Sequence, residues 1–291
     1  MPTAHDLTIL FALTSAVRLG PKTMAALLVH FRDPEGIWEA NIDEIARVGK
    51  LDSASTGRFA EARMKYDEIN SELDRIIDDG TNVVSILDAH YPERLRRLAD
   101  PPTILYHRGE LPDPEQPAIA VVGTHKADHE GIADAVAWGK GLVERGAVVV
   151  SGLARGIDGG GHTGALASDG KTYAVLGSGF ANIYPPEHRQ LAEKITENGA
   201  LLSEYPPKTP LTKQRLVLRN RIIVGLADAV VVVRVHEDTR GSMEAIRRAR
   251  NIAIPIFLVA TDTSSVAQRA VAEGAVPIAQ EPDFDLVLNY L

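Results

Sequence analysis

The chain has 291 residues, of which 45% are apolar and 24% are charged, so it can bury a sizeable core and form a main domain with a smaller one. It contains no cysteine, which excludes disulfides, thiolate catalysis and metal sites built on cysteine. The formal net charge of -8 argues against a protein that coats nucleic acid indiscriminately, although a local basic patch is compatible with it.

The first 20 residues have no basic region ahead of their apolar stretch, and that stretch is too short to cross a bilayer. We therefore expect no signal peptide and no membrane span. The lack of cysteine suits a reducing compartment. The expected location is the cytoplasm.

Residues 6 to 80 are predicted to be helical. Apolar stretches with helical spacing alternate with breakers such as Gly20-Pro21, and a longer polar helix is expected to end before Gly80. This pattern predicts a small helical domain over residues 1–80. A strand-like segment, 82–87, follows, and the proline-dense chain from Tyr91 to Pro114 is interpreted as a connector within the second domain, 81–291.

From Ala118 onward, apolar and β-branched runs alternate with helical segments. The predicted strands are 118–124, 147–152, 172–179, 200–206, 228–235 and 254–260, and the predicted helices lie near 130–145, 159–168, 187–198, 213–226, 242–251 and 263–273. Continuous apolar strands spaced by helices are typical of a parallel sheet covered on both faces. The sequence therefore predicts an α/β fold, an extended Rossmann-like, doubly wound, mainly parallel sheet with a small N-terminal helical domain.

The loops after the first three of these strands are rich in glycine. They contain Gly123 and Thr124, then Ser151, Gly152, Arg155, Gly156 and Asp158 just ahead of a helix, then Gly177 and Gly179. Ligands of such sheets bind at the carboxyl ends of the strands, and exposed N–H groups at a helix start favour an anion. We expect a phosphate cradle here. The alternative is that the glycines only permit tight turns.

The turns between these strands and the predicted helices contain neither the GxGxxG pattern nor the Walker A pattern, so a standard dinucleotide dehydrogenase or P-loop NTPase is not expected. GxSxG and HExxH are also missing, so neither a catalytic residue nor a metal site is assigned, although His125 and His129 are four residues apart. Asp158, Glu204 and Glu244 are acids that more often act as caps, ion-pair partners or hydroxyl acceptors. No cofactor is expected.

The basic residues are concentrated in one segment. Between Lys213 and Arg250, nine Lys or Arg stand against four Asp or Glu, a local charge of +5, so the rest of the chain carries -13. If residues 213–226 form one helix, its apolar residues bury one side and leave four polar ones at the rim: Arg215, Arg219, Asn220 and Arg221. Guanidinium groups bind phosphate oxygens in a bidentate manner. The alternative is a solvated charged face with internal ion pairs.

Several motifs in this chain resemble, in the same order, those of the DNA-processing protein A (DprA/Smf) family over about residues 85–235 and more loosely to 280. They are YPERL, DPPTILYHRGEL, AIAVVGT, VVVSGLARGID, TYAVLGSG, IYPPEHRQL, GALLSEYP and RNRIIVGLADAVVVV. The resemblance implies an extended Rossmann domain that binds single-stranded DNA, forms a homodimer and helps to load the RecA recombinase in natural transformation. The start, LGPKTMAALLVHF, resembles the family's sterile-alpha-like or helix-hairpin-helix-like module, and no C-terminal winged-helix domain is expected.

The candidate DNA- and phosphate-binding residues combine the loops, the basic segment and the resemblance. They are Gly123, Thr124, His125, Lys126, Ser151, Gly152, Arg155, Gly156, Asp158, Gly177, Gly179, Arg215, Arg219, Asn220, Arg221, Arg240, Gly241 and Ser242. The chain departs from the family's pattern in three places. His125 stands where the family usually has Arg, Val217-Leu218 replaces an aromatic-proline pair, and residues 238–245 differ from the usual SGSL-T-A.

The leading hypothesis is a non-enzymatic protein of DNA processing and recombination that binds single-stranded DNA, in natural transformation or a related DNA-uptake or defence role. The alternative is a nucleotide-binding or nucleotide-hydrolysing Rossmann enzyme or sensor, in which Glu244 polarises a water or holds a ribose hydroxyl. A third interpretation is a scaffold that recognises a partner protein through the helical module.

Overall fold

The structure, a computed structural model, describes residues 2–235, 240–259, 264–279 and 283–291. These residues form two compact units. The first comprises Met1–Tyr91, Ala99–Tyr106 and Glu204–Pro207, and the second comprises Pro92–Leu98, His107–Ser203 and Lys208–Leu291. The division of the chain into domains 1–80 and 81–291 stays a prediction. In the described part of the chain, no helix has the length and apolar character that a membrane span requires.

The first unit is mainly helical, as predicted for residues 6 to 80. Its helices are α1 (Ala4–Phe11), the π-helical turn η1 (Ala12–Ala16), α2 (Pro21–Phe31), α3 (Pro34–Glu39), α4 (Ile42–Gly49), α5 (Ser53–Met64) and α6 (Tyr66–Asp78). Four of them begin where a polar side chain accepts a first-turn N–H: Thr3, Asp33, Asn41 and Asp52. The predicted long polar helix is in fact two helices, α5 and α6, which meet at Lys65.

The connector contains more regular structure than its prolines suggest. β1 (Asn82–Ser85) matches the predicted strand-like segment, whereas α7 (Glu93–Arg96) and β2 (Ile104–Gly109) were not predicted. The prolines lie outside both elements, in the turns that flank them. The prolines therefore predicted the turns correctly, but they gave no indication of the short helix and strand between those turns.

The second unit contains a parallel sheet with helices on both faces, as predicted. Its strands are β3 (Ala118–Gly123), β4 (Val148–Ser151), β5 (Thr172–Leu176), β6 (Gly199–Ser203), β7 (Ala229–Arg234), β8 (Ile256–Val259) and β9 (Val276–Ile278), in the spatial order β6-β5-β4-β3-β7-β8-β9. The first six match the predicted strands, and the three-residue β9 was not predicted. The order reverses between β3 and β7, which makes this the switch point of the sheet.

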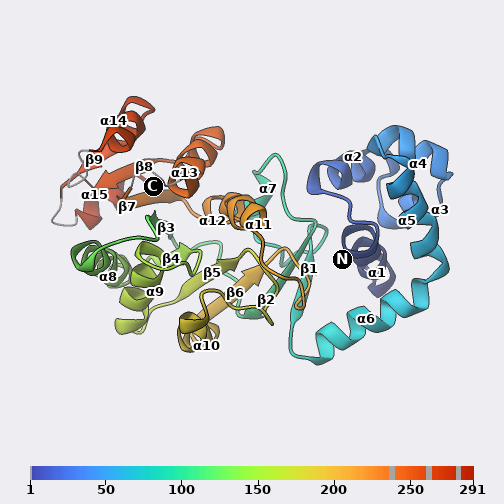
Figure 1. The fold of residues 1–291 in the computed structure, drawn as a ribbon, viewed down its shortest axis with the longest axis horizontal. Coiled ribbons are helices and arrows are strands. Elements are labelled where there is room, and N and C mark those ends of the chain that lie inside the picture. The colour runs from blue at the N-terminus through green and yellow to red at the C-terminus, as the bar shows by residue number, and fades with distance from the viewer. Residues whose placement is uncertain (1, 236–239, 260–263, 280–282) are drawn as a thin grey trace. The chain divides into compact units, whose positions relative to one another are not determined.

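The helices of this unit follow the predicted alternation. They are α8 (His129–Val143), α9 (Ile157–Ala167), the 3-10 turn η2 (Pro186–His188), α10 (Arg189–Glu197), α11 (Lys213–Leu218), α12 (Asn220–Leu226), α13 (Arg240–Asn251), α14 (Ser265–Ala272) and α15 (Phe284–Asn289). Figure 1 shows α8, α9 and α10 along one face of the sheet and α12 and α13 along the other. The strands are buried from both sides, which explains their continuous apolar character.

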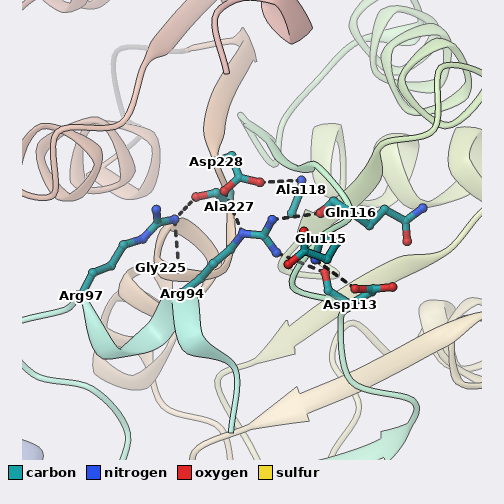
Figure 2. Close-up of polar contacts among 9 residues, drawn as sticks. All are labelled: Arg94, Arg97, Asp113, Glu115, Gln116, Ala118, Gly225, Ala227 and Asp228. Carbon is teal, nitrogen blue, oxygen red and sulfur yellow. Dashed lines mark hydrogen bonds and ion pairs between the residues drawn. The ribbon is translucent and has the colours of Figure 1, made fainter. Parts of the chain in front are cut away.

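Two arginines of α7 and its C-terminal flank fasten the segment Pro92–Leu98 to the second unit (Figure 2). Arg94 Nε donates to Asp228 Oδ1 at 2.7 Å, and Asp228 Oδ2 accepts from the N–H of Ala118 at the start of β3. Arg97 donates to the carbonyl oxygens of Gly225 and Ala227, at the end of α12. Arg94 and Arg97 therefore serve packing at the amino-terminal edge of the sheet.

A buried histidine lies where α9 packs against the sheet. His162 of α9 is 0% exposed, and its Nδ1 lies 2.7 Å from Thr172 Oγ1. Because Thr172 Oγ1 donates to the Val149 carbonyl, it accepts from His162, which places the imidazole proton on Nδ1. Burial, with smaller contributions from His188 and Arg219, lowers the pKa of His162 to about 3.

This histidine is expected to make the protein acid-sensitive. Unfolded histidine takes up a proton below about pH 6.5, whereas folded His162 does so only near pH 3, so its contribution to stability falls as pH drops through that window, by up to about 1.4 kcal/mol per pH unit. Urea unfolding at several pH values should show wild type losing stability relative to His162→Gln as pH falls. Thr172→Val keeps the titrating group, so it should be less stable yet retain the pH dependence. A wild-type minus His162→Gln difference that is constant with pH would contradict this.

Candidate functional site

A pocket of about 410 Å³ lies in the second unit, at the carboxyl ends of β3 and β4 and beside α11, α12 and the first turn of α13. These are the strands and helices around the switch point, where ligands of doubly wound sheets bind. The lining residues are Val122, Gly123, His125, Gly152, Ala154, Arg155, Asp158, Tyr184, Lys213, Leu216, Val217, Arg219, Asn220, Ile223, Gly241, Ser242 and Ala245.

The structure brings half of the predicted site residues to this pocket. Gly123, His125, Gly152, Arg155, Asp158, Arg219, Asn220, Gly241 and Ser242 line it. Thr124, Lys126, Ser151, Gly156, Gly177, Gly179, Arg215 and Arg221 are not part of its lining. The side chain of Arg240 lies outside the described residues. The loops that are far apart in the sequence therefore meet, but not all of their residues face the same space.

Arg219 forms the polar floor of the pocket and is 5% exposed. Its Nη1 donates to the carbonyl oxygens of Gly152 and Val175, and its Nε donates to Asn220 Oδ1 at 3.1 Å. Its Nη2 lies 3.6 Å from Asp158 Oδ2. A Cβ on Gly152 would fall 2.0 Å from the guanidinium, so any larger residue there would have to displace the Arg219 side chain from its hydrogen bonds. The arginine ties the ends of β4 and β5 to the start of α9.

The environment of Asp158 reflects this pairing. Burial raises the pKa of its carboxyl group, while the Arg219 guanidinium and the N–H of Ala154 oppose that rise. Two buried groups of opposite charge stabilise each other only while both are present, because either one alone is left without a counter-charge in a low-dielectric site. Arg219 and Asp158 are thus a structural pair that also borders the pocket.

The prediction of a single amphipathic helix over 213–226 is wrong in two respects. The segment forms two helices, α11 and α12, which meet at Arg219. The burial of the polar residues also differs from the prediction: Ile222, Ile223 and Leu226 are buried as predicted, but Leu218 is 36% exposed while Arg219 and Arg221 are 5% and 2% exposed. Because the helix is interrupted at Arg219, α12 runs into the core and its first polar residues are buried. Carbonyl oxygens accept the hydrogen bonds of Arg219 there. The solvated charged face that was the alternative is not observed for these residues either.

Two predicted hydroxyl ligands are used within the protein. Ser151 Oγ donates to the Val121 carbonyl at 2.6 Å and is 0% exposed. Thr124 Oγ1 accepts the N–H of Lys126 at 3.1 Å, and the Thr124 N–H donates to the Arg234 carbonyl at 2.8 Å. Both side chains therefore fix the turns at the ends of β3 and β4.

Gly156 sets the turn from β4 into α9. It has φ 72° and ψ -124°, a conformation that residues with a Cβ rarely adopt. An added Cβ would lie 2.4 Å from the Thr124 carbonyl oxygen. Gly156, which was predicted to contact phosphate, is thus required by the backbone conformation. At this one position the structure agrees with the alternative, that the glycine only permits a tight turn.

Besides the predicted Arg155, the rim of the pocket carries Tyr184 and Lys213, which are not among the predicted site residues. Arg155 is paired with Glu187 and donates to Tyr184 Oη at 3.3 Å, and Tyr184 lines the pocket. Lys213 is exposed, lines the pocket and has no ion-pair partner among the described residues. The IYPPEHR motif supplies Tyr184 and Glu187, and Lys213 was visible only as one of nine basic residues. Neither motif nor charge count indicates which side chains face the pocket.

Metal binding finds no support in the described segments, in which no group of three or more His, Asp or Glu side chains is arranged to hold an ion. The polar groups of the pocket are mostly donors: the guanidinium groups of Arg155 and Arg219, the Lys213 ammonium and the Asn220 amide. Its walls include apolar side chains of Leu216, Val217 and Ile223. The arrangement suits an anionic ligand that has an apolar or aromatic part.

The family model of DNA recombination-mediator protein A matches residues 82–285 of this chain. DNA processing protein DprA of Bacillus subtilis is 34% identical over 208 residues, which are 68% of this chain and 70% of that protein. Protein Smf of Synechocystis sp. is 33% identical over 219 residues, which are 74% of this chain but only 55% of that protein. The chain thus spans about half the length of some of its curated relatives.

Solved structures agree with this match. The X-ray structure of DNA processing protein A from Streptococcus pneumoniae superposes with a TM-score of 0.81 at 27% identity and covers 95% of both chains. DNA processing protein A from Helicobacter pylori, whose structure concerns its single-stranded DNA binding mode, has a TM-score of 0.63 at 24% identity, over 72% of this chain and 96% of that chain. With a family model that matches most of its length and this fold, the chain belongs to the DNA-processing protein A (DprA/Smf) family.

Proposed function

We propose that this protein binds single-stranded DNA through the pocket at the switch point and acts in DNA processing and recombination. The observation that carries the proposal is the combination of cationic groups and apolar walls in one pocket. Lys213 and Arg155 stand at its rim, and Leu216 and Val217 form part of its wall. Family membership supports the same ligand, since the Helicobacter pylori protein of this fold binds single-stranded DNA.

The chemistry of single-stranded DNA fits both features. Phosphates attract lysine and arginine and release counterions on binding, which gives most of the affinity without regard to sequence. Unstacked bases present apolar faces, which duplex DNA hides inside its stack, and these faces can pack on aliphatic or aromatic side chains. A pocket with both surfaces therefore favours single strands over duplex. His125, in the place of the family's usual Arg, lines the same pocket and is exposed.

Lys213→Ala is expected to weaken binding of single-stranded DNA about equally for every sequence. Its ammonium is exposed at the pocket and unpaired among the described residues, so its loss removes about one phosphate contact. The plot of log K against log salt should become shallower by about 0.7. Fluorescence anisotropy with single-stranded and duplex oligonucleotides over a range of salt measures affinity, strand preference and slope together.

Lys140→Ala is the matched control, because Lys140 is also exposed but lies on α8, outside the pocket lining. It removes the same charge from the chain and should leave both affinity and slope close to wild type. Equal binding by all three proteins, or no oligonucleotide binding even at low salt, would refute the proposal.

The further parts of the proposal follow from family membership. The protein is proposed to act as a homodimer in the cytoplasm, without catalysis, and to deliver the strand to a RecA-type recombinase in natural transformation or a related DNA-uptake or defence role. Light scattering measures the dimer, and the rate at which a RecA-type recombinase assembles on single-stranded DNA, with and without the protein, measures loading.

A hydrolytic role for Glu244 gains no support from its surroundings. Its two carboxylate oxygens pair with Arg247 at 2.6 Å and Arg248 at 2.8 Å, along its own helix. Glu244 is also not among the lining residues of the pocket. We therefore do not propose it as the group that polarises a water.

A further inference from the structure

Ser242 lies in the first turn of α13 and is 3% exposed. Its Oγ has no hydrogen-bond partner among the residues that the structure describes, although the residue lines the pocket. A buried hydroxyl is normally paired, because an unpaired one has lost its water without compensation. The serine hydroxyl therefore points to a ligand that completes its hydrogen bonds.

The surroundings of Ser242 specify the charge of that ligand. The first N–H groups of an α-helix have no partner within the helix and carry its positive dipole end, so the N–H groups of Gly241 and Ser242 favour an anion. Asn220 Nδ2 donates one N–H to the Gly241 carbonyl at 3.2 Å, and its second N–H is a further side-chain donor. The position of a Cβ on Gly241 is open apart from this amide at 3.7 Å. Several donors therefore border a space that an anion can enter.

The apolar lining of the pocket indicates the chemistry of the rest of the ligand. Leu216, Val217 and Ile223 present aliphatic surface to the same pocket. A volume of about 410 Å³ is at the small end of the range for ligand sites, about 300–1,000 Å³, which leaves room for one nucleotide and not for a run of several. The Asp158 carboxylate on the floor is an acceptor for a sugar hydroxyl or a base N–H.

We propose that this pocket holds one nucleotide with a terminal phosphate monoester, the phosphate against Ser242 at the start of α13 and the base against Leu216 and Val217. A monoester carries up to two negative charges, and an internal phosphodiester carries one, so a helix N-terminus favours the terminal group. The ligand is either the phosphorylated 5′ end of a DNA strand or a free nucleoside monophosphate. The proposal rests on the proposed function for the location of the DNA site, and adds what that site recognises.

The test compares ligands that differ only in the phosphate. Two fluorescent single-stranded oligonucleotides of one sequence carry a 5′-phosphate or a 5′-hydroxyl, and thymidine 5′-monophosphate is compared with thymidine as a competitor. The phosphorylated ligand is expected to bind about tenfold more tightly in at least one of the two pairs. A preference only between the oligonucleotides identifies the strand end, and a preference for the free monophosphate identifies the free nucleotide.

Ser242→Ala is expected to abolish the preference and to leave the thermal midpoint of the ligand-free protein unchanged or higher, since the lost hydroxyl has no partner in the described protein. Ser265→Ala is the matched control: Ser265 is the first residue of α14, is exposed and does not line the pocket. It should keep the preference.

Three results separate this inference from the proposed function. Equal binding of both oligonucleotides, with thymidine monophosphate no better than thymidine, overturns the inference and leaves the DNA-binding function standing. Binding of the monophosphate without binding of either oligonucleotide overturns the DNA-binding function and upholds the inference. A phosphate preference that persists in Ser242→Ala overturns the assignment to α13.

Discussion

Arg219→Ala is expected to lower the free energy of unfolding by about 3–5 kcal/mol, because it leaves the buried Asp158 carboxylate without its counter-charge. The carbonyl oxygens of Gly152 and Val175 lose their guanidinium donor as well. This is a large fraction of the stability of an ordinary domain. A surface arginine that only contacts phosphate would change stability by less than about 0.5 kcal/mol.

Urea unfolding followed by circular dichroism measures this loss, and a double-mutant cycle with Asp158→Asn isolates the pair. Because either single change leaves one partner unsatisfied, the double variant should lose less stability than the two single losses combined. Lys213→Ala is the comparison for a cationic pocket residue that is exposed, and it should unfold like wild type. If Arg219→Ala were as stable as wild type and defective only in DNA binding, the structural role of Arg219 would be wrong.

Gly156→Ala is expected to lower the free energy of unfolding by about 3 kcal/mol or more, since two effects combine at this residue. The backbone at φ 72° and ψ -124° strains any residue with a Cβ, by about 1–3 kcal/mol. The new Cβ would also fall 2.4 Å from the Thr124 carbonyl oxygen, and overpacking costs about 1–3 kcal/mol more. Since the turn leads from β4 into α9, its displacement would also move Arg155 and Asp158.

Gly146→Ala separates the two effects. Gly146 has φ 84°, but an added Cβ would meet nothing within 4 Å, so only the backbone strain of about 1–2 kcal/mol is expected. Thermal and urea unfolding of both variants under one condition give the comparison. Equal losses would show that the contact with Thr124 relaxes easily, against the expectation.

The fold class could be predicted from the sequence because it depends on a repeated pattern of strand and helix. Six apolar strands alternate with helical segments, and each pair of strand and helix repeats the same signal, so an error at one boundary does not change the architecture. Short elements that are not part of this repeating pattern were not predicted. The three-residue β9 contains a proline, and α7 and β2 lie among prolines that mark the turns beside them.

A pocket at the carboxyl edge of the sheet was also predictable, since parallel strands end at one edge, and two of the three glycine-rich loops border it. Which side chains face the ligand was not. Ser151 and Thr124 are polar residues in the expected loops and Arg219 is a polar residue of the basic segment, yet each satisfies backbone groups of the protein. A polar residue in a turn has the same sequence signature whether it binds a ligand or the chain itself, because both uses need the same donors.

The amino-acid sequence alone is sufficient to predict a doubly wound α/β fold, an acidic chain with one basic segment, and the family. The three-dimensional structure was needed to show that Arg219 is buried beneath the pocket while Lys213 is exposed at its rim, and that the Ser242 hydroxyl has no hydrogen-bond partner among the described residues. The physical reason is that burial and hydrogen-bond partners come from segments far apart in the chain. Arg219 meets Gly152, Val175 and Asp158, and no local pattern records those distances.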